Sequence, residues 1–198
     1  MVAVLETDPS AVCAYPDCDL VDARGVTIAR GVCGAFSVER MVVDGRNPIG
    51  PGAVFRADAF RDLSGWRTDV TLGADDDFFW LRMSTLGQLR FVPEPLASYR
   101  VHRAALSRMR VSEMRACEPL RVVRDYFARD DVPAPIRARE AEAWANAHRR
   151  IATRMLRAGR LAATWRHRSR AAAFAATRRR EETISFVTRL RVLRALAR

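Results

Sequence analysis

The three consecutive aspartates at residues 75–77 carry the clearest candidate chemistry in the chain. They directly precede an apolar run in which Phe79, Met83 and Leu86 recur at helical spacing. Backbone N–H groups at the start of a helix are unpaired and partly positive, so acids there are held ionised and fixed in direction. Such a carboxylate at the rim of a cleft can act as a general base, although acids are also routine helix caps.

The first 107 residues alternate between strand and helix patterns, which predicts an α/β layer. Breaker residues predict a turn at 16–19, a hairpin turn at 22–25 and a loop at 47–52. Residues Pro93–Pro95 are expected to end a strand. The expected strands are 11–15, 26–28, 53–55 and 89–92, with extended residues at 96–101, and a short helix is expected at 58–63.

The pattern becomes helical from about residue 111 to the end. Ser112 is a candidate N-cap for a helix that ends at Phe127. A helix hairpin is expected at about 136–177, with Gly159 in its turn, followed by a last helix at 181–197. One apolar stripe of the hairpin consists of Trp144, Ala147, Ile151 and Met155.

The charge of the chain is divided between its two halves. All 34 basic residues are arginines, and the net charge is +11. Residues 1–107 hold 11 arginines and 14 acids, whereas residues 108–198 hold 23 arginines and 9 acids. This asymmetry predicts two physical units, an α/β unit at 1–107 and an Arg-rich helical extension at 108–198.

The four cysteines form no C-x-x-C pair and have no histidine at zinc spacing. The sequence also shows no signal peptide and no apolar run near 18 residues. We therefore expect reduced thiols and a cytoplasmic protein.

Four segments together resemble the C-terminal half of family 2 glycosyltransferases, the inverting nucleotide-sugar enzymes of the GT-A fold. They are AVCAYPDCDLVDARGV, NPIGPGAVFRADAFRDLSGW, GADDDFFWLRMSTLGQLRFVPEPLASYRVH and the closing Ser107. Their order and spacing agree with that family over about residues 10–107. The resemblance implies a partial GT-A, Rossmann-like mixed sheet with helices, whose donor-binding N-terminal half is missing.

The resemblance also implies a reaction. A sugar would pass from a nucleotide-sugar donor to a hydroxyl acceptor with inversion, in cell-envelope or polysaccharide glycan synthesis. Alignment on Trp80-Leu81-Arg82 puts Asp76 at the position of the catalytic base and Asp75 at the preceding acid, where the family more often has Glu. An alcohol becomes a good nucleophile only as its proton is removed, which a placed carboxylate can accelerate.

The family uses a divalent metal, Mg or Mn, to stabilise the leaving diphosphate. His102 is the metal ligand that the resemblance suggests, with a surface or packing role as the alternative. The sequence Asp17-Cys18-Asp19 matches an Asp-x-Asp motif literally, but its context resembles a hairpin that follows the metal motif in the family. We therefore do not expect it to be the metal site.

Three further residues are candidate substrate contacts. Arg56 and Arg100 could each pair with a diphosphate, with structural salt bridges as the alternative. Trp66 is a candidate platform for a sugar ring, whereas Trp80 is expected in the core.

The helix expected at 181–197 is basic and amphipathic, with Arg191, Arg194 and Arg198 on one face and Phe186, Leu190 and Leu193 on another. Such a helix could lie on an anionic membrane at the inner face, although a solvated face of a bundle would look the same. No nucleic-acid-binding motif accompanies the positive charge, so we expect no nucleic acid partner.

Two functions from different classes remain open at this point. The first is the glycosyltransferase. The second is a catalytically inactive, truncated remnant that acts as an interaction or membrane-surface helical module. The second predicts that this chain does not bind a nucleotide diphosphate-sugar with micromolar affinity.

Overall fold

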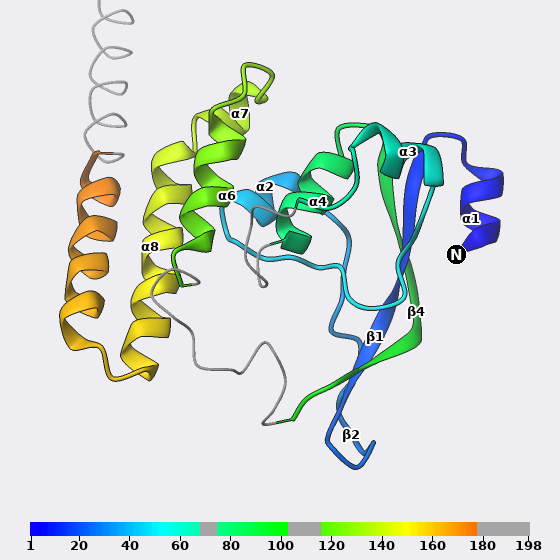
Figure 1. The fold of residues 1–198 in the computed structure, drawn as a ribbon, viewed down its shortest axis with the longest axis horizontal. Coiled ribbons are helices and arrows are strands. Elements are labelled where there is room, and N and C mark those ends of the chain that lie inside the picture. Colours follow the sequence, from blue (N-terminus) through cyan, green and yellow to red (C-terminus); the bar gives the residue numbers. More distant parts are fainter. Residues whose placement is uncertain (68–74, 103–115, 178–198) are drawn as a thin grey trace, which may run out of the picture. The chain divides into compact units, whose positions relative to one another are not determined.

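The computed structural model describes residues 1–67, 75–102 and 116–177 (Figure 1). The chain separates into two compact units, Met1–Glu118 and Pro119–Arg198. The first contains a sheet with helices and the second is helical in its described part, so the prediction of a mixed α/β fold is confirmed.

The sheet of the first unit is built around β1 (Ala11–Val21). Along one edge β1 pairs in parallel with β4 (Gln88–Arg100), and the two long ribbons lie side by side in Figure 1. Along the other edge it pairs antiparallel with β3 (Val54–Phe55) near its start and with β2 (Thr27–Ala29) near its end. The first six residues of β1 are all buried, as expected for a central strand.

The predicted turn at 16–19 is wrong, and so is the predicted strand end at Pro93–Pro95. Both segments lie inside continuous strands. The prolines are tolerated because the pairing is irregular where they occur: Pro16 pairs with Val92, but Asp17 already pairs with Pro95. Residues 93 and 94 of β4 therefore bulge out of the ladder, so Pro93 is not required to donate a backbone hydrogen bond there.

Four helices are described in the first unit: α1 (Val2–Thr7), α2 (Val38–Val42), α3 (Ala57–Asp62) and α4 (Asp75–Met83). Helix α2 is capped by Ser37, whose hydroxyl accepts a hydrogen bond from the Arg40 N–H. Helix α3 ends where predicted, because Ser64 and Gly65 both take positive φ angles of 55° and 73°. The hairpin turn at residues 22–25 is also confirmed.

Helix α4 packs on the sheet through an aromatic cluster. Phe79 and Trp80 are buried, with ring centroids 5.3 and 6.2 Å from that of Phe55 on β3. Met83 shares the buried side as predicted, but Leu86 is 41% exposed. The helix ends at Met83, so Leu86 lies in the following turn and leaves the predicted face.

The second unit contains α6 (Glu118–Phe127), α7 (Ala134–Arg137), α8 (Glu140–Arg157) and helical residues 161–177. The predicted helix hairpin with Gly159 in its turn is confirmed, and Ala147, Ile151 and Met155 are buried. Helix α6 ends at Phe127 as predicted. Ser112 and the helix expected at 181–197 lie outside the described residues.

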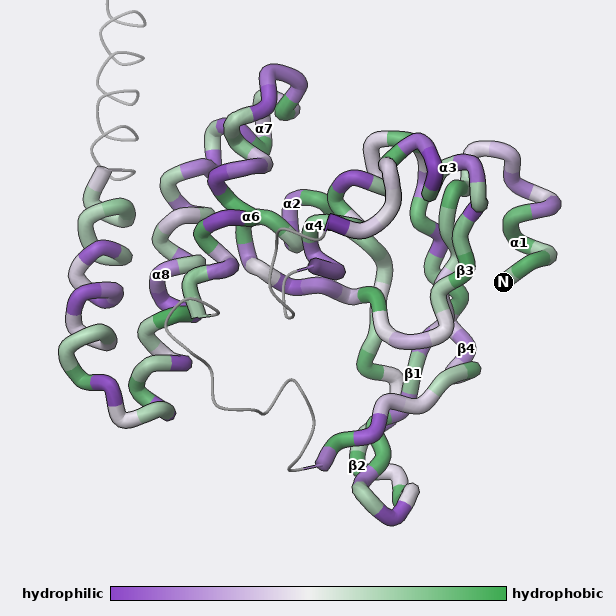
Figure 2. Tube along the Cα trace, viewed as in Figure 1, coloured by the Kyte–Doolittle hydropathy of each residue, from purple (hydrophilic) through white to green (hydrophobic). Residues whose placement is uncertain are grey.

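Hydrophobic and hydrophilic residues alternate around α8 and the helix that follows it (Figure 2), so both helices are amphipathic. Among the described residues, every helix is too short or too polar to cross a lipid bilayer.

Candidate functional site

Asp76 occupies the first turn of α4, and its carboxylate is fixed by two hydrogen bonds. Oδ2 accepts from the side-chain amide of Asn47 at 3.2 Å, and Oδ1 accepts from the backbone N–H of Asp77 at 2.9 Å. The residue retains solvent contact. The carboxylate is therefore oriented and accessible, as a proton acceptor must be.

The surroundings of Asp76 favour its protonated form. Solvent reaches the residue, but the surrounding protein partly desolvates its carboxyl group. This desolvation raises the pKa of Asp76 above its usual range. The adjacent charge of Asp75 raises that pKa further, while the N–H of Asp77 acts in the opposite direction. A carboxylate with a raised pKa is a stronger base near neutral pH.

Asn47 is a site residue that the sequence pattern did not identify. It is 29 residues from Asp76 in the chain and lies in the loop expected at 47–52. Its own side-chain oxygen accepts from the Ile49 N–H at 3.0 Å, which fixes the side chain and aims its amide at Asp76. Asparagine before proline reads only as a loop signal, so nothing local could have revealed this contact.

Trp66 lies beside α4. Its ring stacks on Phe79, with centroids 3.9 Å apart and planes 23° from parallel, and it is 41% exposed. One ring face is thus covered by protein while part of the side chain faces solvent, an arrangement that suits stacking on a ligand. Trp80, expected in the core, is 6% exposed.

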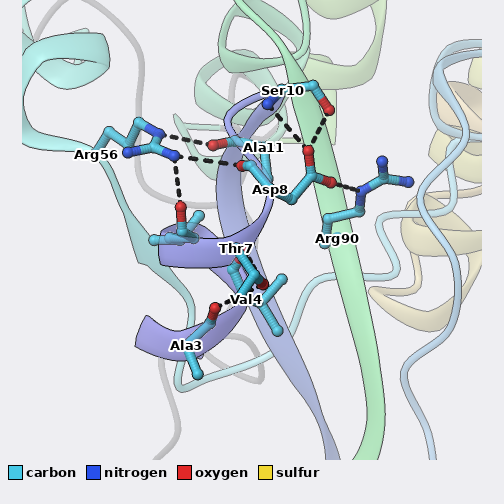
Figure 3. Close-up of polar contacts among 9 residues, drawn as sticks. Ala3, Val4, Thr7, Asp8, Ser10, Ala11, Arg56 and Arg90 are labelled. Atoms are coloured by element: carbon cyan, nitrogen blue, oxygen red, sulfur yellow. Dashed lines mark hydrogen bonds and ion pairs between the residues drawn. The ribbon is translucent and has the colours of Figure 1, made fainter.

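Arg56 binds the protein's own backbone (Figure 3). Its Nε donates to the Ala11 carbonyl at 2.8 Å, and its Nη2 donates to the carbonyls of Leu5 and Asp8 at 2.6 and 3.3 Å. These contacts tie the end of α1 to the start of β1. The structure gives Arg56 a structural role, and we do not retain it as a substrate contact.

Arg100 also contacts backbone carbonyls, at the other end of the sheet. Its Nη1 donates to the carbonyls of Asp22 and Ala23 at 3.2 and 3.1 Å, in the turn between β1 and β2. Arg56 contacts the first residue of β1, whereas Arg100 pairs with the last. An eleven-residue strand spans about 35 Å, so these two arginines cannot share one diphosphate.

The described residues offer no good fit for the divalent metal. Across residues 1–67, 75–102 and 116–177, no group of three or more His, Cys, Asp or Glu side chains is placed to hold an ion. His102 follows directly after β4, with residues 103–115 outside the described part. We therefore derive no step through a metal.

The carboxylates of Asp17 and Asp19 each accept a hydrogen bond from a backbone N–H group. Asp17 Oδ1 accepts from Cys33 at 2.9 Å, and Asp19 Oδ1 accepts from Gly31 at 3.1 Å. The two carboxylates thus hold residues 31–33 against β1.

The structure thus brings together Asp75, Asp76 and Asn47, with Trp66 packed on the same helix. A groove of about 750 Å³ lies elsewhere, between α8 and residues 161–177, and none of the predicted site residues lines it. The segment 68–74, which leads into Asp75, lies outside the described residues.

Neither the protein-family models nor the curated proteins include a match to this chain. The glycosyltransferase resemblance therefore continues to depend on the residues quoted above.

Proposed function

We propose that the first unit is the acceptor side of a family 2-like inverting glycosyltransferase, with Asp76 as the general base. The observation that carries this proposal is the state of the Asp76 carboxylate: solvent-accessible, fixed by Asn47 and the Asp77 N–H, and raised in pKa. A residue that only capped α4 would gain nothing from a raised pKa, because capping favours the ionised form.

In the proposed reaction the acceptor hydroxyl gives its proton to a carboxylate oxygen of Asp76. The alcohol oxygen forms a bond to the anomeric carbon as the bond to the nucleoside diphosphate breaks on the opposite face, which inverts the configuration. Asn47 keeps the carboxylate in position, and the charge of Asp75 increases its basicity. The exposed part of Trp66 is available to stack on a sugar.

The cellular setting proposed with this activity is cell-envelope or polysaccharide synthesis at the cytoplasmic face of the membrane. This setting follows from the same family resemblance.

The test is a transfer assay with a panel of nucleotide diphosphate-sugars at millimolar concentration and alcohol acceptors. We expect Asp76→Asn to lower the transfer rate by about 10²–10⁴, the range typical of a lost general base. Asp77→Asn removes the same charge from the same helical turn and should change the rate less than about tenfold. Equal losses in the two variants would count against Asp76 as the base.

A second candidate is the catalytically inactive interaction module. It is favoured by Arg56 and Arg100, which contact backbone carbonyls at opposite ends of β1 and so do not converge on one diphosphate. Titration calorimetry separates the candidates. The inactive module predicts no micromolar binding of a nucleotide diphosphate-sugar with or without Mg or Mn, and tight metal-dependent binding would exclude it.

A further inference from the structure

The turn of the helix hairpin in the second unit exposes three large apolar side chains. Leu156 is 52% exposed, Leu161 is 70% exposed and Trp165 is 73% exposed. Trp165 and Leu161 have the highest exposed fractions among the large hydrophobic residues of the described chain. These three residues fall within ten positions of one another, on both sides of Gly159. Burying such side chains away from water is favourable, so their grouping suggests a partner surface.

The turn holds these residues in a defined geometry. Gly159 has a φ of 72°, its N–H donates to the Leu156 carbonyl at 3.0 Å, and the Arg160 N–H donates to the Met155 carbonyl at 2.9 Å. This pair of bonds is the Schellman arrangement, which ends α8, and the next helix begins at Leu161. Leu156 and Leu161 are therefore fixed on either side of the turn.

Leu161 and Trp165 continue the face that forms the groove between the two helices. At about 100° per residue, both lie within roughly 60° of Arg168 and Ala172, which line that groove. Leu156 lines the same groove from α8. The apolar residues at the turn therefore lie on the same helix faces as the groove lining. We call Leu156, Leu161 and Trp165, together with the groove, the hairpin surface.

The charge around the hairpin surface has one sign. Residues 143–177 include eight arginines and no aspartate or glutamate. Arg157 and Arg168 are both exposed, and Arg168 lines the groove beside Leu156. An apolar tip surrounded by arginines complements a partner that is anionic at its surface and apolar beneath it.

We propose that the hairpin surface docks on a bilayer that contains anionic lipids. Leu156, Leu161 and Trp165 enter the interfacial region, and Arg157 and Arg168 face the headgroup phosphates. Tryptophan prefers this region because its ring is apolar and its indole N–H is polar. A nucleic acid would also match the charge, but its phosphate backbone offers no apolar layer for the two leucines.

The proposal is tested by co-sedimentation of the full chain with vesicles of equal parts phosphatidylglycerol and phosphatidylcholine. We expect the double variant Leu161→Ala, Trp165→Ala to partition roughly tenfold or more weakly, because it removes most of the exposed apolar surface at the turn. Arg157→Gln and Arg168→Gln should each weaken binding roughly fivefold at low salt, and pure phosphatidylcholine vesicles should bind poorly.

The matched control is the double variant Leu96→Ala, Tyr99→Ala. It removes exposed apolar side chains from β4 in the other unit and should leave vesicle binding unchanged. Circular dichroism should show native helix content in both double variants, since the substituted residues are exposed.

A second measurement reports the depth of Trp165 directly. Lipids brominated near the headgroup should quench tryptophan fluorescence in the full chain, and Trp165→Phe should keep binding while losing most of the quenching. Trp66, Trp80 and Trp144 remain in that variant and supply the background.

Three outcomes would overturn the proposal. The first is that the Leu161→Ala, Trp165→Ala variant binds vesicles as well as the native chain does. This outcome includes the case in which vesicle binding is abolished only by substitutions of Phe186, Leu190 and Leu193. The second is that the Leu161→Ala, Trp165→Ala variant differs from the native chain in oligomeric mass but not in vesicle binding. The hairpin surface would then bind a second copy of this chain. The third is that the native chain binds duplex DNA in a salt-dependent way but does not bind vesicles, and that the variant loses this DNA binding.

Discussion

Asp76 combines two influences that usually oppose each other. A helix start and an N–H donor favour its ionised form, whereas desolvation and the neighbouring Asp75 charge favour its protonated form. The second pair prevails, because the pKa of Asp76 is raised. A raised carboxyl pKa costs stability at neutral pH, and such a cost is typical of residues held for chemistry.

We predict that an NMR titration will show Asp76 losing its proton at higher pH than an ordinary aspartate. Because the charge of Asp75 contributes to that shift, Asp75→Asn should move the pKa of Asp76 downward. Asp62→Asn, a charge change at the end of α3, is the control. If the pKa of Asp76 is unchanged in Asp75→Asn, the charge of Asp75 does not contribute to the raised pKa of Asp76.

The same shift sets a stability trend. A raised folded-state pKa means that the folded chain binds this proton more tightly than the unfolded chain. The contribution of Asp76 is therefore present at low pH and is lost as the pH rises through the folded-state pKa. In urea unfolding we expect Asp76→Asn to gain stability relative to the native chain as the pH rises from acidic to neutral. A native chain that gains stability relative to Asp76→Asn as the pH rises would contradict this sign.

At the scale of elements, β4 begins in close contact with the start of β1. A Cβ added at Gly87 would lie 2.6 Å from Val12 Cγ1 and 2.7 Å from the Ser10 carbonyl oxygen, where β4 begins beside β1. The neighbouring Gln88 N–H donates to that same carbonyl. The backbone at Ser10 cannot move away from Gly87 without breaking the hydrogen bond that joins the starts of β1 and β4.

We therefore expect Gly87→Ala to destabilise the first unit by about 1–3 kcal/mol in urea unfolding, the usual range for overpacking. Gly34→Ala is the matched control, since nothing lies within 4 Å of a Cβ built there. It should change the stability by less than about 0.5 kcal/mol. Similar losses from both substitutions would mean that loss of glycine, and not steric crowding, is responsible.

The helix hairpin contains a buried histidine pair. His148 on α8 and His167 on the next helix lie with their Nδ1 atoms 2.8 Å apart, and each is 4% exposed. Burial, the proximity of His167 and the charge of Arg170 lower the pKa of His148 to about 4. The unfolded chain binds this proton more tightly, so stability is present above the unfolded pKa and is lost as the pH falls.

The window for this loss runs from pH 6.5 down to about 4. Across this pH window we expect the free energy of unfolding of the second unit to fall by up to roughly 3 kcal/mol. Urea unfolding monitored by helical circular dichroism measures this loss. His148→Gln should flatten the dependence, while His102→Gln, in the other unit, should leave it in place. A dependence that survives His148→Gln would assign it to other groups.

At the scale of the whole molecule, the chain consists of two units with separate cores and opposite charge balance. The first is centred on β1 and the aromatic residues of α4, and the second on Ala147, Ile151 and Met155 of α8. Chains built in this way commonly unfold in more than one step.

We predict two unfolding transitions in urea. In the variant Trp144→Phe, Trp165→Phe, the remaining Trp66 and Trp80 report on the first unit alone. Gly87→Ala should lower the midpoint of this fluorescence transition and leave the transition of the α8 hairpin unchanged. A single midpoint shared by fluorescence and helical circular dichroism, moving together in Gly87→Ala, would contradict two independent units.

The sequence by itself determined the elements whose signals are local. The helix at the three aspartates, the end of α3 at Ser64-Gly65 and the hairpin around Gly159 all follow from residues close in the chain. Apolar spacing likewise identified the buried stripe of α8. Helices are defined by contacts within four residues, so their sequence patterns can be recognised without knowledge of the tertiary structure.

The tertiary structure alone decided what depends on distant partners. Pro16 and Pro93 read as strand ends, yet β1 and β4 continue through them because the pairing shifts register at that point. Arg56 and Arg100 read as candidate diphosphate ligands until their contacts placed them at opposite ends of β1. The Asn47 amide reaches Asp76 across 29 positions, and no local pattern encodes a hydrogen bond formed only when a loop and a helix meet.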